Sequence, residues 1–167
     1  MQNVSPLCKR GGILFVPMSI MCATKKKLSS ERIAELTEFC EHLHLHFNDL
    51  NLLDLAFHHR SFSNENKDFR HENNERLEFL GDSVLGLVTA AFLYSDMDNP
   101  EGDLAHIKAS VVSEQSLAPI ALEHMHIDRY LVLGKGEELS GGRTKKAILA
   151  DAVEAVIGAL YLDSGYA

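Results

Sequence analysis

Two acidic residues, Asp151 and Glu154, stand out because residues 147–162 around them are almost wholly apolar. They are three positions apart, so they share one face if the segment is a helix. Acids are rarely buried unless they are paired or bound to a metal. Two adjacent carboxylates in an apolar helix repel each other and therefore need cations. Those cations are either a metal ion or basic side chains such as Arg76 or Lys108.

A second acidic set lies in residues 74–83. On a helix, Glu75, Glu78 and Asp82 fall within about 60° of one another. The alternative for Glu75 is an ordinary solvated surface position. Beyond Asp82 the segment is nearly apolar all round, which predicts burial. The face opposite the acids is apolar and consists of Leu77, Leu80, Val84, Leu87, Val88 and Ala91.

Four acids drawn from these two segments predict an oxygen-ligand site for a hard divalent cation, and Mg²⁺ fits that donor set. Zinc is not favoured, because no His or Cys stands at ligand spacing to these acids. The chain also lacks a His-Asp dipeptide, a phosphate-binding glycine loop followed by Lys, and a convincing Ser, His and Asp grouping. These absences disfavour several other hydrolase classes.

The elements that would position these acids are helices, and the fold class is predicted as all-α. No segment alternates apolar and polar residues for long, and the strand-like run at residues 130–133 is isolated. Ser30 is expected to cap the first helix and Asn74 the third. Residues 61–73 and 134–143 are expected to be loops. The helices are expected at about 30–45, 52–59, 74–95, 103–125 with a break near Pro119, and 147–162.

Residues 1–28 are predicted to be an extension, and residues 29–167 one domain. The apolar run within the extension is too short to span a bilayer. The extension is a disordered tail, a signal peptide, or the result of a start codon placed too early, with Met18 or Met21 as the true start. The odd number of cysteines, Cys8, Cys22 and Cys40, favours free thiols in a reducing cytosol.

Charge complicates a nucleic-acid function, because phosphate binding normally requires Lys and Arg. The net charge is −8, and residues 1–28 hold five basic residues and no acidic one. The remaining domain is therefore more acidic still. It would bind a nucleic acid poorly unless metal ions offset its carboxylates or another domain supplies positive charge.

Residues 75–83 (ERLEFLGDS) resemble the signature of the ribonuclease III family. The blocks at 134–137, 140–143, 148–155 and 158–165 are similar to that family as well. The resemblance covers residues 29–167 and implies a ribonuclease III endonuclease-type helical domain that works as a homodimer. Family members usually continue into a basic double-stranded-RNA-binding domain, whereas this sequence stops at Ala167. Either the chain is truncated, or RNA capture relies on another molecule.

The resemblance assigns roles residue by residue. Glu78, Asp82, Asp151 and Glu154 match the metal-binding acids, with Asp82 and Glu154 as catalytic residues, and Glu75 and Glu101 match further acids of the cleft. Phe79 matches an aromatic residue inserted into the partner subunit, the alternative being an ordinary core Phe. The candidate RNA phosphate contacts, which are otherwise solvated surface residues, are Lys108, Arg143, Lys145 and Lys146.

The family resemblance implies Mg²⁺-dependent cleavage of double-stranded RNA, with Mn²⁺ expected to substitute, leaving 5′-phosphate and 3′-hydroxyl ends. Processing of rRNA and mRNA precursors in the cytoplasm is the expected role, with no membrane association. One alternative is a non-catalytic dimeric RNA-binding module on the same fold. Another is an all-α metal-dependent phosphohydrolase of small molecules, which the missing His-Asp dipeptide disfavours.

Overall fold

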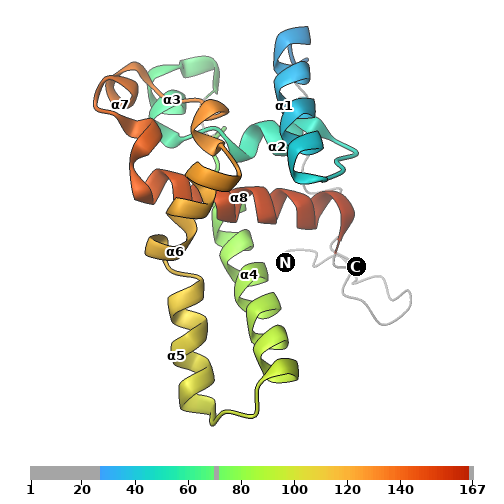
Figure 1. The fold of residues 1–167 in the computed structure, drawn as a ribbon. Coiled ribbons are helices and arrows are strands. Elements are labelled where there is room, and N and C mark those ends of the chain that lie inside the picture. Colours follow the sequence, from blue (N-terminus) through green and yellow to red (C-terminus); the bar gives the residue numbers. More distant parts are fainter. Residues whose placement is uncertain (1–26, 70–71, 166–167) are drawn as a thin grey trace, which may run out of the picture.

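A computed structural model describes residues 27–69 and 72–165, and these form helices joined by short loops (Figure 1). No strand occurs in these ranges, where His58 and Val132 form one isolated bridge, so the all-α prediction is confirmed. Positions 1–26 of the predicted extension, which include Cys8 and Cys22, lie outside the described residues. The α-helices are α1 (Ser30–Leu43), α2 (Leu50–Ala56), α3 (Arg60–Glu65), α4 (Glu75–Asp96), α5 (Glu101–Val111), α6 (Glu114–Pro119), α7 (Lys135–Leu139) and α8 (Lys146–Ser164).

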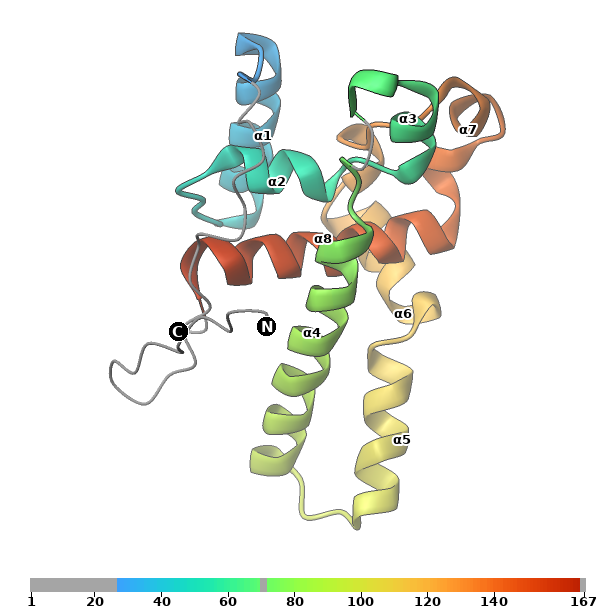
Figure 2. The ribbon, with the colours of Figure 1, turned by 180° about the vertical axis from the view of Figure 1, so that it is seen from behind.

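Helix α8 is the centre of the fold. Its small apolar residues, including Ala152, Val153, Ala155 and Ala159, are buried almost completely. Helices α4, α6 and α2 pack around it, and α4 makes the most extensive contact. Seen from both sides, α8 runs across the molecule, with α1 and α2 on one side and the α4–α5 pair on the other (Figures 1 and 2). This burial explains why the segment is apolar all round.

Helices α4 and α8 cross at very short range through two glycines. A Cβ atom built on Gly81 of α4 would overlap the backbone carbonyl oxygen of Glu154. A Cβ atom on Gly158 of α8 would likewise overlap the carbonyl oxygen of Leu77. Glycine lowers helix propensity by about 1 kcal/mol relative to alanine, so its presence inside two helices needs a packing reason. The close approach of the two backbones is that reason.

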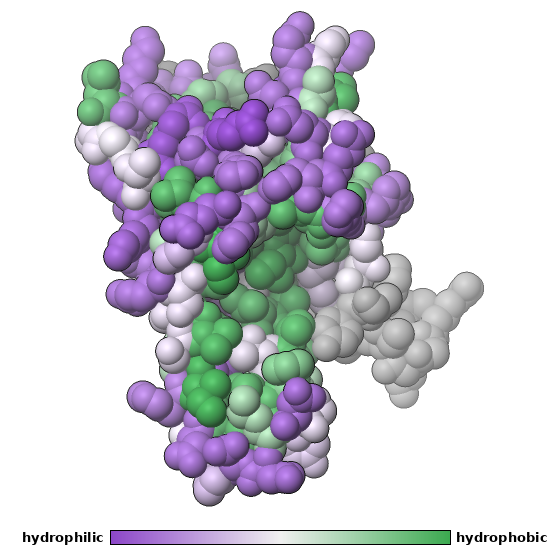
Figure 3. Space-filling view, in the orientation of Figure 1, coloured by the Kyte–Doolittle hydropathy of each residue, from purple (hydrophilic) through white to green (hydrophobic). Residues whose placement is uncertain are grey.

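The distal part of α4 corrects one prediction. Its apolar residues were expected to be buried, but Leu87, Phe92 and Tyr94 are 61%, 58% and 83% exposed. Helices α4 and α5 extend beyond the rest of the molecule as a pair, so only one side of α4 is covered (Figures 1 and 2). Figure 3 shows apolar side chains gathered over this region. A single chain therefore leaves this face of α4 uncovered.

Helix α4 is also long and apolar enough, by length and composition alone, to cross a membrane. Core helices of globular proteins pass the same test. The first turns of α4 contain buried Leu77 and Gly81, which pack against α8. That packing ties the start of α4 to the core of this domain.

Several predicted boundaries and caps were wrong. Ser29, not Ser30, caps α1, because its side chain accepts a hydrogen bond from the Arg32 backbone N–H at 3.1 Å. Asn74 precedes α4 but its side chain makes no capping bond; it donates to the Ala56 carbonyl oxygen at 3.3 Å. The buried position of Asn74 explains the difference, because its amide is used to join α4 to the end of α2.

Three segments also differ from the prediction. Residues 61–73, expected as a loop, contain most of α3 and a 3-10 turn at Lys67–Phe69, and residues 134–143 contain α7. The expected 103–125 helix is interrupted before α6 and continues past Pro119 as a π-helical turn, Ile120–His124. Each of these helices is short, and each is held by contacts with other segments rather than by its own periodicity. Two further 3-10 turns lie at Ile127–Arg129 and Gly142–Thr144.

The glycine crossing yields a stability prediction. Gly81→Ala should lower the free energy of unfolding by about 2–3 kcal/mol, because the new methyl group collides with backbone atoms that cannot rotate away. Urea unfolding at fixed protein concentration measures the change. Gly102→Ala is the matched control: its Cβ would meet no atom within 4 Å, and it should change stability by less than about 1 kcal/mol. Equal effects at the two positions would contradict the close crossing.

Candidate metal centre

Three carboxylates meet where α4 crosses α8. One oxygen from each of Glu78, Asp151 and Glu154 can be chosen so that all three lie within 4.8 Å of one another. All three side chains are partly buried. Asp82, one turn along α4, is exposed and is not part of this set, but its charge acts on both Glu154 and Glu78. The fold thus brings three of the four expected ligands together, with Asp82 at their edge.

The acids perturb one another strongly. Burial, then the charges of Asp82, Glu78 and Asp151, raise the pKa of Glu154 to about 7. Burial and the Asp151 carboxylate are the leading causes that raise the pKa of Glu78. Burial and the charge of Glu114 raise the pKa of Asp151. Holding several of these groups ionised at neutral pH requires positive charge.

Basic side chains do not supply that charge by direct pairing. Across the described residues, no Lys, Arg or His nitrogen lies within 4.0 Å of a carboxylate oxygen of Glu78, Asp151 or Glu154. The alternative in which Arg76 or Lys108 neutralises the pair on α8 is therefore not what the structure contains. A cluster of oxygen donors with raised pKa values and no ion pair fits a hard divalent cation, which prefers carboxylate oxygens.

Sequence reasoning missed two charged residues near the cluster. Arg60, the first residue of α3, carries a positive charge that lowers the pKa of both Glu78 and Asp151. Glu114, the first residue of α6, acts on Asp151 in the opposite direction. Arg60 was assigned to the boundary of a loop and Glu114 to the middle of a long helix. Only the tertiary fold brings them near α8, so no local pattern indicated either residue.

The other acidic and aromatic residues predicted for the site, Glu75, Glu101 and Phe79, lie in different parts of the fold. Glu75 begins α4, is 51% exposed on its side chain, and lies 3.5 Å from Arg60 Nη1. Glu101 begins α5, and the loop before it lies at the end of the α4–α5 pair remote from α8 (Figures 1 and 2), so one chain does not bring it to the cluster. Phe79 is 78% exposed, which rules out an ordinary core Phe within the single chain.

Two of the four candidate phosphate contacts are already engaged within the chain. Arg143 donates to the Glu138 carboxylate at 2.7 Å and to the backbone carbonyls of Asp128 and Leu131 at 2.7 and 3.0 Å. Lys145 Nζ lies 2.5 Å from a carboxylate oxygen of Glu137. These contacts hold the segment before α8 in place. The other two candidates are Lys108, partly buried near the end of α5, and Lys146, exposed at the start of α8.

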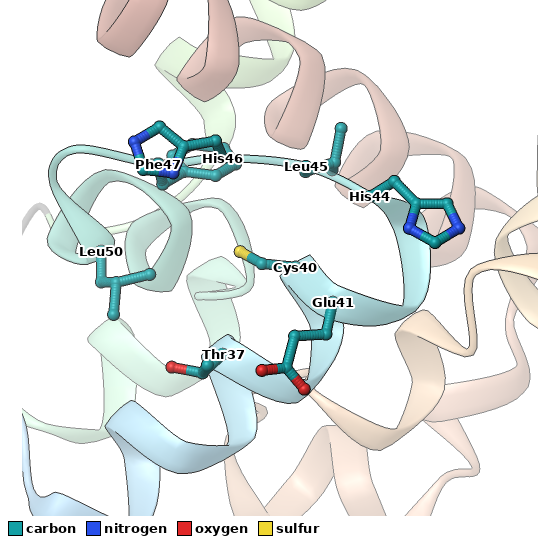
Figure 4. A pocket seen from close by; sticks show the side chains of 8 residues that line it. All are labelled: Thr37, Cys40, Glu41, His44, Leu45, His46, Phe47 and Leu50. Carbon is teal, nitrogen blue, oxygen red and sulfur yellow. The ribbon is translucent and has the colours of Figure 1, made fainter.

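A pocket of about 550 Å³ lies elsewhere, beside α1 and the loop that follows it (Figure 4). Cys40, a buried free cysteine, and Glu41 lie on its α1 wall. The side chains of Glu41 and His44 point in different directions in this view, so these two do not converge on one ligand. It shares no residue with the acid cluster.

Comparisons with known proteins agree with this geometry. Residues 49–167 match the Ribonuclease-III-like family model. The chain is 63% identical over 147 residues to Ribonuclease 3 of Treponema denticola, covering 87% of this chain and 59% of that protein. It is 52% identical to Ribonuclease 3 of Borreliella afzelii, covering 83% of this chain and 56% of the relative. The chain thus spans a little over half the length of these curated relatives.

A solved structure with the same fold is the nuclease domain of ribonuclease III from Campylobacter jejuni. It is 40% identical in sequence and superposes with a TM-score of 0.72, covering 78% of this chain and 87% of that one. Its description refers to structural flexibility in a region involved in dimer formation. The likeness extends to the sequence as well as the helical architecture.

The raised pKa of Glu154 predicts how stability depends on pH in the metal-free protein. Unfolding returns Glu154 from a pKa of about 7 to its ordinary 4.5. Between these values the folded state binds more protons, so stability falls as pH rises and levels off above pH 7. Glu154→Gln should reduce this decline in the free energy of unfolding by on the order of 1 kcal/mol. The effect is no larger because solvent screens a half-buried group.

Urea unfolding in EDTA at pH 5, 6, 7 and 8 measures this difference. The parental protein is the control, since burial is the largest cause that raises the pKa of Glu78 and of Asp151, and it acts in both proteins. Identical pH profiles for the two proteins would contradict a strongly perturbed Glu154 carboxyl.

Proposed function

Because the chain belongs to the Ribonuclease-III-like family, we propose that it is the nuclease domain of an endoribonuclease that cleaves double-stranded RNA in the presence of Mg²⁺. The observation that carries this proposal is the meeting of Glu78, Asp151 and Glu154 at the α4–α8 crossing, without a basic partner among the described residues. A domain that merely bound RNA would gain nothing from clustered carboxylates that repel phosphates. The cluster therefore favours catalysis over the non-catalytic module.

Glu78, Asp151 and Glu154 would hold the divalent cation, with Asp82 as a further ligand at the exposed edge. Mg²⁺ is the expected ion and Mn²⁺ an expected substitute. When bound, the ion would activate a water molecule and neutralise charge on the departing 3′-oxygen, which gives 5′-phosphate and 3′-hydroxyl ends. The chain's own part is positional: the buried α8 orients Asp151 and Glu154, and the glycine crossing fixes Glu78 against them.

We also propose that two copies of the chain form the working unit. The exposed apolar residues of α4, among them Leu87, Phe92 and Tyr94, need a cover in water, and a second copy of the same face provides one. Phe79 lies on this helix beside Glu78, so an inserted aromatic side chain would link the two subunits close to the acids. Two sites related by a two-fold axis would each cut one strand across the minor groove of the duplex.

The proposed substrates are structured precursors of rRNA and mRNA, as the family resemblance implies, and the proposed setting is the cytoplasm. Cys40 agrees with a reducing compartment, since it is a buried free thiol. Recognition of RNA would rest on A-form shape, 2′-hydroxyl groups and phosphate positions, which distinguish duplex RNA from DNA.

Cleavage of a labelled RNA duplex tests the proposed activity. Glu154→Gln and Asp82→Asn should each lower the rate at saturating Mg²⁺ by at least about 100-fold, because each removes a negative ligand from the site. Glu41→Gln, an acid beside the α1 pocket, is the matched control and should cleave at the parental rate. Normal cleavage by either site variant would refute the assignment, and a duplex left uncut by the parental protein would refute the activity.

The dimer makes a separate prediction. Leu87→Glu places a charge on the exposed face of α4 and should convert the dimer to a monomer, as read by sedimentation velocity, and lower cleavage with it. Leu139→Glu is the control, because Leu139 is 90% exposed on α7, outside this face, and its charge should leave assembly unchanged. A parental protein that sediments as a monomer would contradict the proposal.

A further inference from the structure

Arg60 combines a fixed backbone with a loosely held side chain. The residue before it, His59, donates its backbone N–H to the Val132 carbonyl at 3.1 Å, and its ring accepts from the Ser61 backbone N–H at the start of α3. One residue earlier, the His58 carbonyl accepts from the Asn74 backbone N–H at 2.8 Å. The backbone leading to Arg60 is thus tied both to residue 132 and to the residue that precedes α4.

The Arg60 guanidinium itself has a single weak attachment within the described residues. It is 66% exposed, and its Nη1 lies 3.5 Å from an oxygen of Glu75, which is 51% exposed. Arg32 is held far more firmly: it is 16% exposed and bonds to Asp54 at 2.7 Å and to the Tyr130 carbonyl at 2.9 Å. Leaving Glu75 would therefore cost Arg60 little.

Arg60 lies near the acid cluster but is not paired with its acids. Its charge reaches Glu78 and Asp151, yet it forms no ion pair with either of them. A counter-ion for the cluster would be seated among the carboxylates. A cation beside the cluster is instead placed to meet an anion that approaches it. A phosphodiester drawn toward several carboxylates is repelled, and a neighbouring guanidinium offsets that repulsion and donates paired hydrogen bonds.

We propose that Arg60 is a substrate-binding residue, whose guanidinium leaves Glu75 and binds a phosphate of the RNA backbone next to the bond that is cut. This inference rests on the proposed function. The contact is to the backbone, so it raises affinity for any duplex RNA without choosing a sequence. It would supply positive charge beside the acid cluster, whereas Arg143 and Lys145 are committed to contacts within the chain.

Direct binding tests the inference without cleavage. In a Glu154→Gln background with Mg²⁺, a fluorescent RNA duplex is titrated with protein at several salt concentrations between about 20 and about 200 mM. Arg60→Ala should raise the Kd roughly 5- to 10-fold at about 100 mM salt. It should also reduce the slope of log Kd against log salt by about 0.9 for each phosphate that the protein no longer neutralises. Arg60→Gln should behave like Arg60→Ala, and Arg60→Lys should retain most of the slope because it keeps the charge.

Arg129→Ala is the matched control. Arg129 is 56% exposed and has one carboxylate partner, Glu38, at 3.1 Å, so it resembles Arg60 in exposure and pairing. It is not among the charges that shift the pKa values of the acid cluster. The substitution should leave both the Kd and the salt slope unchanged. In the cleaving protein, Arg60→Ala should raise KM while kcat stays within about 3-fold, the pattern of weakened substrate binding.

Two results would overturn the inference. If Arg60→Ala binds RNA with the parental Kd and salt slope, Arg60 does not contact phosphate. If RNA binding is unchanged while calorimetry shows tighter Mn²⁺ binding to the Arg60→Ala protein, Arg60 is a counter-ion of the cluster instead. Absence of RNA binding by the Glu154→Gln protein itself at about 20 mM salt would reject the proposed function as well, which separates the two failures.

Discussion

The close crossing of α4 and α8 is the constraint on which the site depends. Gly81 and Gly158 let each helix touch the backbone of the other, so side chains that start on different helices end in one cluster. Glu78 lies one turn before Gly81, and Glu154 lies one turn before Gly158. Helices that meet through larger side chains have axes about 8–10 Å apart, which would carry these carboxylates away from one another. The two glycines weaken their own helices, and the surrounding packing must offset that loss together with the repulsion between the acids.

The partly buried acids among the described residues include two kinds, which differ in their partners. Burial alone would raise the pKa of Asp54, but contacts with His58 at 3.1 Å and Arg32 at 2.7 Å lower it overall. Asp163 also has a lowered pKa, despite burial, because the backbone N–H groups of Asn48 and Asp49 donate to it. These two acids join α2 to α1 and α8. Among the described residues, the acids at the crossing have raised pKa values and no comparable partner, as expected of a site that binds a cation.

The sequence predicted the elements that carry a strong periodic or compositional signal. The apolar helix around Asp151 and Glu154 and the acidic face of α4 were both evident from spacing, and the structure brings three of their acids together. Short helices were missed because their signals are tertiary: α3 is capped by the ring of His59, which is not a usual capping residue, and α7 is held by the Glu65 carboxylate, which accepts from the Lys135 and Gly136 backbone N–H groups. Arg60 and Glu114 were missed for the same reason, since their importance comes from proximity across the fold.

The prediction that the distal part of α4 is buried was wrong for a single chain. The apolar composition on which it rested still calls for a cover, and the start of α4 limits what that cover can be. A membrane would need to surround α4 along its length, yet Leu77 and Gly81 are buried against α8 and Glu78 belongs to the acid cluster. Surrounding α4 with lipid would expose the α8 core and place carboxylates in hydrocarbon, which is strongly unfavourable. A second copy would cover only the distal face and leave the crossing intact. Because Phe79 stands on α4 next to Glu78, the same helix would carry both the subunit contact and a metal ligand, so assembly and site geometry would be coupled through one rigid element.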